Sequence, residues 1–258
     1  MAATATSVVH ADDVPASRTS GDTAETRVTF DRSNGCTLLE QRVIRFHPGR
    51  SQQQLLDGRQ EVLYVVSGRG RLYLDGEPHT LEPNMGVFIA PRETYAIENS
   101  GPEPLDVVSV VAPEDRAAAR SERRVTVRFR DQPELSASAE RTFKYLVNED
   151  AGCFDVTQFV GIVQPSKAPF HSHTYDEVGY IVEGEGFAHI EGDSIPLRAG
   201  SCFHLLPGQE HCIENSGSTA MRILGVFHPA GDPASREYGD NKYAGKTSHR
   251  AERTNQGG

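Results

Sequence analysis

The amino-acid sequence predicts an all-β protein built from two tandem barrels that are joined by a short helical linker. The segment from Glu61 to Gly101 aligns without a gap on the segment from Glu177 to Gly217, and 14 of the 41 paired positions are identical. Each copy contains short runs rich in Val, Ile, Tyr and Phe that end at Gly, Pro or Asn, which is typical of β-strands. A repeat of this length indicates two copies of a whole domain, because the units of a solenoid are shorter.

The repeat and the local composition divide the 258 residues into four segments. Residues 1–25 are rich in Ala, Thr, Ser and Asp, so we expect a disordered N-terminal tail. We expect the first barrel at 26–125, the second barrel at 126–232 and a C-terminal tail at 233–258. The segment 113–124 starts with Pro and acidic residues, as helices do, and is predicted to form the helical linker.

Composition and charge argue against several classes of partner. A net charge of −10 disfavours nucleic acid and anionic membranes, and no run approaches the roughly 18 apolar residues that cross a bilayer. The N-terminus has no basic region followed by an apolar core, so no signal peptide is predicted. The four cysteines are too few for a disulfide framework in a chain of this length. We therefore expect a cytoplasmic homodimer that acts on a small molecule, with no nucleic-acid or membrane partner.

The second copy carries histidines and a glutamate at a spacing that suits a metal site. His171 and His173 are two residues apart, so both side chains point to one face of an extended segment, and Glu177 keeps the same parity. His211 follows a Pro-Gly turn further along. Three imidazoles and a carboxylate suit Fe, Mn, Co, Ni, Cu or Zn better than Mg or Ca. We therefore predict one divalent transition metal per chain, held by these four side chains.

The same residues resemble the two motifs of the cupin superfamily, over about four-fifths of the chain. The first motif is His-any-His followed by Glu and Gly, and the second is Gly, a Pro-Gly turn, His and Asn. Here they are His171, His173, Glu177 and Gly184, and then Gly200, Pro207, Gly208, His211 and Asn215. The resemblance implies two double-stranded β-helix (jelly-roll) barrels with the metal inside the second. It also favours iron, because relatives with this quartet are often dioxygenases.

The first copy lacks the residues that would hold a metal. At the offset of 116 residues, Leu55, Asp57 and Tyr95 stand where the second copy has its three histidines. Only Glu61 matches a ligand, and leucine cannot coordinate a metal. We therefore expect the first barrel to hold no metal and to stabilise, dimerise or cover the second barrel. A small-molecule site in its cavity is the alternative.

Other side chains near the quartet are candidates for acid–base or substrate-binding roles. His204 is predicted to be catalytic and to point inward, because it replaces the apolar Phe88 of the first copy. A polar residue on the outside of the barrel is the alternative. Tyr175 is the second catalytic candidate, at the mouth of the site. The further candidates are His189, Gln158 and Gln164, whereas Cys202 and Cys212 are expected to be buried, inert thiols.

Three classes of function remain open at this point. The favoured one is an oxygen-dependent, dioxygenase-like oxidation of a small organic substrate by a metal-dependent enzyme. The second is Lewis-acid chemistry, as in an isomerase, lyase, decarboxylase or hydrolase. The third is a protein that binds a metal or small molecule without catalysis. The intact quartet argues against storage alone, because ligands without a chemical role are free to vanish, as they did in the first copy.

Overall fold

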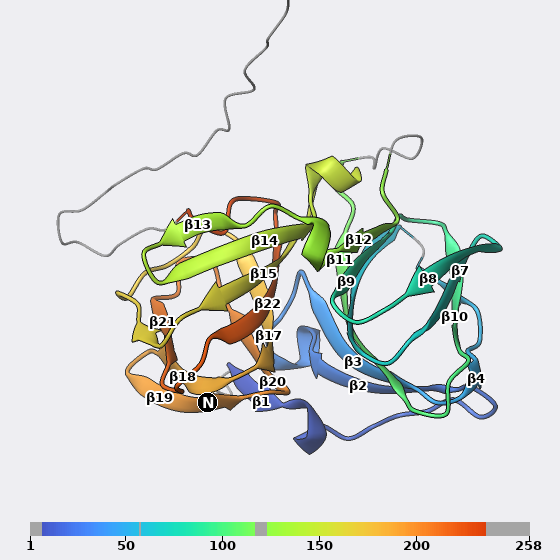
Figure 1. Ribbon diagram of the computed structural model, residues 1–258, viewed down its shortest axis with the longest axis horizontal. Helices are drawn as coiled ribbons and strands as arrows, with labels where there is room; N and C mark the ends of the chain where they lie inside the picture. The colour runs from blue at the N-terminus through green and yellow to red at the C-terminus, as the bar shows by residue number, and fades with distance from the viewer. Residues whose placement is uncertain (1–6, 57, 117–122, 236–258) are drawn as a thin grey trace, which may run out of the picture.

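The computed structural model describes residues 7–56, 58–116 and 123–235, and most of them lie in β-strands. Figure 1 shows two barrels side by side, with the first half of the chain in blue to green and the second in yellow to red. Each barrel consists of one large and one small antiparallel sheet. The prediction of two tandem all-β barrels is therefore confirmed.

The first barrel combines a six-stranded sheet, in the order β12-β9-β6-β11-β3-β2, with a smaller sheet in the order β4-β10-β7-β8. Strand β5 also pairs with β10. Its strands are β2 (Ala24–Phe30), β3 (Glu40–Phe46), β4 (Gly49–Arg50), β5 (Gln54–Leu55), β6 (Arg59–Ser67), β7 (Gly70–Leu74), β8 (Glu77–Leu81), β9 (Met85–Ile89), β10 (Thr94–Asn99), β11 (Leu105–Pro113) and β12 (Thr126–Arg128).

The second barrel combines a seven-stranded sheet, in the order β1-β20-β17-β22-β15-β14-β13, with a four-stranded sheet in the order β16-β21-β18-β19. Its strands are β1 (Val8–His10), β13 (Leu135–Ser138), β14 (Arg141–Val147), β15 (Thr157–Val163), β16 (Ser166–Lys167), β17 (Asp176–Glu183), β18 (Glu185–Ile190), β19 (Asp193–Arg198), β20 (Ser201–Leu205), β21 (His211–Asn215) and β22 (Met221–His228).

Short 3-10 helices are the other regular elements in the described part of the chain. They are η1 (Ala11–Asp13), η2 (Arg32–Asn34), η3 (Phe129–Asp131) and η4 (Glu149–Ala151). Asn84 adopts φ of 64°, and Gly200, its counterpart in the second copy, adopts φ of 91°. Asn tolerates this left-handed backbone better than most residues, so the turn survives the exchange of glycine for asparagine.

The two barrels share a core in addition to the one inside each of them. Their large sheets pack against each other through apolar residues of both halves, among them Phe88 and Val226. Two hydrogen bonds cross this interface symmetrically: Gln41 donates to the carbonyl of Gly179 at 3.1 Å, and Gln158 donates to that of Leu63 at 3.2 Å. Alternate residues of each large sheet therefore face either a barrel interior or the other barrel.

The barrels also exchange short strands. Strand β1 pairs with β20 of the second barrel, and β12, which follows the first barrel in sequence, pairs with β9 of the first. Residues 7–25 are therefore ordered, contrary to the expected disordered tail over 1–25, because β1 completes an edge of the second barrel. The expected start of the second barrel at 126 is likewise too early, since residues 126–128 form β12 in the six-stranded sheet of the first barrel.

The ends of the linker are not helical, in contrast to the prediction for 113–124. Strand β11 runs to Pro113, and neither 114–116 nor 123–124 is in a helix, while 117–122 lie outside the described residues. Most of the expected C-terminal tail, from 236 onward, lies outside them as well. No helix in the described part of the chain has the length and apolar character needed to cross a bilayer.

Candidate metal centre

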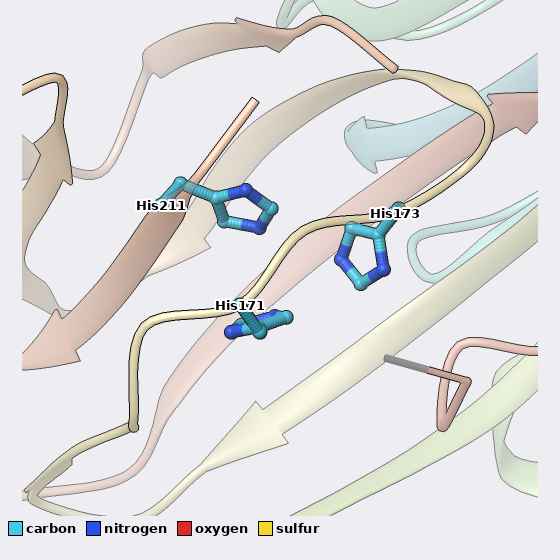
Figure 2. A group of neighbouring side chains, drawn as sticks. All are labelled: His171, His173 and His211. Atoms are coloured by element: carbon cyan, nitrogen blue, oxygen red, sulfur yellow. The ribbon is translucent and has the colours of Figure 1, made fainter. Parts of the chain in front are cut away.

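Three histidines from two segments of the second barrel converge on one point. His211 begins β21, whereas His171 and His173 lie on the connection between β16 and β17. That connection is not a regular strand: an isolated bridge joins His171 to His211 through backbone hydrogen bonds of 3.0 and 2.9 Å, and Gly208 N donates to the carbonyl of His173 at 2.7 Å. One ligand atom from each ring lies within 4.8 Å of the other two, and Figure 2 shows the rings around a common space.

The hydrogen bonds of the three rings determine which nitrogen faces that space. In each ring, Nδ1 contacts a backbone carbonyl oxygen, which only accepts hydrogen bonds, so Nδ1 carries the proton. The partners are Pro169 at 3.0 Å for His171, Ser235 at 3.1 Å for His173 and Gln209 at 2.9 Å for His211. In a neutral ring the lone pair is then on Nε2, the atom available to ligate a metal. The carbonyl bonded to Nδ1 fixes the orientation of each ring. This donor set fits a transition-metal ion.

Glu177 lies beside the three histidines, near the start of β17. Its Oε2 is 3.7 Å from Nε2 of His173, and both side chains are buried. Gly225 on β22 lies directly behind it: a Cβ there would stand 3.2 Å from Oε1 of Glu177 and 2.3 Å from the ring of Phe159. Glycine at this position therefore leaves room for both side chains inside the barrel.

A small cavity of about 80 Å³ opens onto these four residues. Its walls are mainly apolar, with Phe159 and Phe203 among them, and Arg141 from β14 is the cation in the wall. A guanidinium nitrogen of Arg141 donates to the backbone carbonyl of Ile213, which anchors the side chain against β21. A charged group beside an apolar cavity interacts with an anion more strongly than it would in bulk water.

Arg141 was not among the residues that the sequence predicted, although a signal for it exists. Strands β2 and β14 correspond at an offset of 117 residues, so Arg141 takes the position of Ala24 in the first copy. Ala24 lines the corresponding cavity of the first barrel. A change from alanine to arginine at a position that faces the barrel interior in both copies would have identified it.

The first barrel has no comparable centre among its described residues. Leu55 is exposed, Tyr95 is buried, and Asp57 lies outside the described residues. The carboxyl of Glu61 is buried and accepts a hydrogen bond from Ser109, which stands where the second barrel has Gly225. Burial raises the pKa of Glu61, with the hydrogen bond from Ser109 opposing the shift. A hydroxyl group therefore contacts one oxygen of the carboxyl at the position where the other barrel has Glu177.

His204 does not point into the metal cavity, in contrast to the prediction that it faces inward. On β20, Phe203 and Leu205 line the cavity, so His204 has the opposite parity and faces the first barrel. Its Nε2 lies 2.6 Å from Oδ1 of Asp176, and its ring lies 5.7 Å from that of Phe30. Phe88 faces the same interface from the other side, so the comparison of the two copies indicated burial rather than an interior position.

Tyr175 lies behind the centre rather than at its mouth. Its hydroxyl is 3.0 Å from Nδ1 of His173, and its ring stacks on His173 and on Phe227, at centroid distances of 4.6 and 3.9 Å. It is buried and is not part of the cavity wall. Tyr175 therefore packs against a candidate ligand and lies outside the wall of the cavity.

Replacing Tyr175 with Phe should lower the affinity for the metal by roughly 10- to 100-fold, the usual effect of removing a partner behind a ligand. The ring stacking remains, so the barrel should stay folded. Competition with a chelator measures the effect. Tyr145→Phe, which alters a hydroxyl 3.5 Å from Asp232 in the same barrel, should bind metal as the unmodified protein does. Equal affinity in Tyr175→Phe would show that Tyr175 only packs against His173.

The remaining candidates lie away from the cavity. His189 contacts Ser194 at 2.8 Å and Glu214 at 2.7 Å, Gln158 contacts the first barrel, and Gln164 is exposed. Cys202 and Cys212 are buried, as predicted, and burial raises the pKa of the Cys202 thiol to about 12 and that of Cys212 as well. Both thiols are therefore protonated at neutral pH and weak nucleophiles.

Curated relatives match part of the chain. An oxalate-binding protein from Thermotoga maritima is 37% identical over 63 residues, which are 24% of this chain and 52% of that protein. An uncharacterised protein from Methanocaldococcus jannaschii is 32% identical over 65 residues, which are 25% of this chain and 52% of that protein. The chain thus spans about half the length of the curated relatives that it matches.

Solved structures share the fold over most of the chain. The protein Ylba from E. coli has a TM-score of 0.72 at 13% identity, covering 87% of this chain and 91% of that chain. A mutant of Bacillus subtilis oxalate decarboxylase has a TM-score of 0.73 at 12% identity, covering 90% and 79%. At these identities the likeness shows a common architecture alone.

A family model establishes the relationship for both halves. The model of the cupin domain matches residues 42–111 and 159–227, one segment in each barrel and together more than half of the chain. The two segments contain most of the strands of the two barrels. The chain therefore belongs to the cupin family, with two cupin domains in tandem.

Proposed function

We propose that this protein is a metal-dependent enzyme that acts on a small carboxylate in the cavity of the second barrel. His171, His173, Glu177 and His211 would hold the ion. The support is the orientation of the three rings, each fixed through Nδ1 by a carbonyl so that Nε2 faces the common space. One ligand atom from each ring lies within 4.8 Å of the other two, with the Glu177 carboxyl beside them, and a donor set of this kind suits a transition-metal ion.

The single observation that carries the substrate class is Arg141 in the wall of the cavity. The planar guanidinium presents N–H donors in a fork that matches a carboxylate. A carboxylate between the ion and Arg141 would meet positive charge on two sides, whereas a neutral substrate would gain little from either. The cavity of about 80 Å³ admits only a small molecule. The names of the oxalate-binding relative and of the oxalate decarboxylase with the same fold agree with this class.

For the reaction we propose an oxygen-dependent oxidation. Among the described residues of the cavity wall, the side chains that exchange protons are the three histidines and Glu177, apart from the always charged Arg141. If all four are occupied as ligands, none remains to protonate a carbanion. An iron ion at this site would supply redox chemistry with dioxygen. Arg141 would hold the carboxylate in position, and Phe159 and Phe203 would exclude water from the reacting atoms.

Decarboxylation is the second candidate, and the position of Glu177 favours it. The three histidines alone form the compact group of ligand atoms, and Glu177 approaches them through His173 at 3.7 Å. A Glu177 carboxyl that is not bound to the ion could deliver a proton to the carbon atom that loses carbon dioxide. In that case the ion would act as a Lewis acid, and dioxygen would not be consumed.

Turnover of small carboxylates without oxygen separates the two candidates. With oxalate, glyoxylate and related acids as substrates and ferrous iron as the metal, we expect turnover to stop under anaerobic conditions and to return with air. Oxygen uptake should match the substrate consumed. Undiminished anaerobic turnover that is lost in Glu177→Gln with metal retained would instead establish decarboxylation. Failure to turn over any carboxylate with any of the expected metals would contradict the enzyme proposal.

A further inference from the structure

A second group of metal-ligating side chains lies where the two barrels meet. Cys36 of the first barrel and Asp176 and His204 of the second each place one ligand atom within 4.8 Å of the others. All three are buried, with exposed fractions of 0, 2 and 3%. Asp176 precedes Glu177 on β17 and so faces the opposite side of the sheet from the cavity. This group is therefore separate from the candidate metal centre inside the barrel.

The charges in this group suit a divalent cation. Nε2 of His204 lies 2.6 Å from Oδ1 of Asp176, so a nitrogen and an oxygen donor stand side by side. Burial raises the pKa of the Cys36 thiol to about 12, and the nearby charge of Asp176 adds to the shift. One thiolate, one carboxylate and a neutral imidazole around a divalent ion carry no net charge, which limits the cost of burial. Sulfur, nitrogen and oxygen donors together are typical of zinc sites.

The pseudosymmetry of the molecule provides an internal comparison. Cys153 is the counterpart of Cys36, and its thiol donates to Oε1 of Gln60 at 3.2 Å. Gln60 and Phe88 occupy the positions that correspond to Asp176 and His204. Each half thus places a buried cysteine at the interface, but only Cys36 has potential metal ligands, Asp176 and His204, beside it. General packing requirements of the interface do not explain this difference, because the other half meets them with an amide and a phenyl ring.

A further imidazole lies on the same face. His228 on β22 pairs directly with Asp176 of β17, which puts the two side chains on one side of the sheet. His228 is buried, and neither ring nitrogen forms a hydrogen bond within the described part of the chain, although Nε2 lies 3.1 Å from Asp115. Its counterpart in the first half is Ala112. The second half therefore carries potential ligands at three interface positions where the first half has glutamine, phenylalanine and alanine.

We propose that Cys36, Asp176 and His204 bind a second divalent ion of the zinc type, which ties the first barrel to the second. On binding, the ion replaces the proton of the Cys36 thiol, which is released to solvent, and His204 ligates through Nε2 as a neutral imidazole whose proton is on Nδ1. No oxidation or reduction is involved. The chain then holds two ions, one more than its sequence motifs predict, and the second has a thiolate ligand that the barrel centre lacks.

Cobalt substitution of the full-length protein tests this directly. Only a Co²⁺ ion with a thiolate ligand gives a strong thiolate-to-cobalt charge-transfer band in the near ultraviolet. We expect this band and two equivalents of Co²⁺ in the unmodified protein. Cys36→Ser should lose the band and one equivalent, whereas Cys153→Ser, the pseudosymmetric control, should keep both. His173→Ala should keep the band, because it removes only the other ion.

A second variant guards against misfolding as the cause of a loss. His204→Phe copies the residue that the first copy carries at this position, so the interface should remain packed while an imidazole ligand is removed. We expect a weakened or absent band and a fold that circular dichroism finds unchanged. Absence of the band in the unmodified protein, or its persistence in Cys36→Ser, would overturn the proposal and leave a buried His204–Asp176 ion pair beside a neutral thiol.

Discussion

Replacing His211 with Tyr, the residue at the corresponding position of the first copy, is expected to abolish turnover. A neutral phenol is a poor ligand where an imidazole was bound, and one coordinating side chain is lost from a set of four. The loss of activity should exceed the roughly 10- to 100-fold that removal of a partner behind a ligand costs. Steady-state turnover of the carboxylate substrate, with metal analysis of the same sample, measures both effects.

The matched control for this variant is His189→Gln. His189 is a buried histidine of the same barrel that contacts Ser194 and Glu214 instead of the cavity. It should retain the metal and the turnover of the unmodified protein. If His211→Tyr kept full activity, or if His189→Gln lost as much activity as His211→Tyr, the chemistry would not take place at the centre described here.

Replacing Arg141 with Ala should have the second-largest effect, on substrate rather than on metal. A hydrogen bond to a charged group contributes about 1.5–3 kcal/mol, so kcat/KM for a carboxylate should fall roughly 10- to 150-fold. Arg141→Lys should recover part of this, because it restores the charge without the fork of donors. The metal content should be unchanged, since Arg141 contacts the carbonyl of Ile213 and is not a metal ligand.

A comparison of a charged with an uncharged substrate decides whether Arg141 recognises a carboxylate. The amide of the same substrate, which lacks the negative charge, should lose far less in kcat/KM than the carboxylate does. Arg198→Ala, in an exposed arginine on β19 of the same barrel, should change neither value. An equal loss for the acid and the amide would show that Arg141 shapes the cavity and does not recognise a carboxylate.

The repeat and the metal motif were predictable because they depend on local pattern and on comparison within the chain. Short β-runs at a fixed offset indicate two similar barrels, and the spacing of His171 and His173 predicts that both side chains face one side of an extended segment. His211 was assigned to the same site by its place after the Pro-Gly turn of the second cupin motif. The structure brings these histidines together through a bridge between His171 and His211. Parity together with the two cupin motifs therefore predicted their convergence, although His171 and His173 do not lie on a regular strand.

Which face of a strand lies inside the barrel could not be read from the sequence. His204 and Gln158 alternate correctly with apolar neighbours, but both faces of the large sheets are buried, one in a barrel and one between barrels. An alternation of apolar and polar residues then no longer shows which face of the strand lies in the core and which in solvent. The exchanged strand β1 was missed for another reason: its three residues are too few to show a pattern, and its pairing with β20 depends on the whole fold.

Metal analysis of the His173→Ala variant tests the central claim most directly. Compared with the unmodified protein, the account predicts the loss of one equivalent of metal per chain and an unchanged β-sheet spectrum, because two barrel cores do not depend on one ion for folding. Glu61→Gln, which alters the matching carboxyl of the first barrel, should lose none. Full metal content in His173→Ala, or the loss of one equivalent in Glu61→Gln, would contradict a metal centre inside the second barrel and none inside the first.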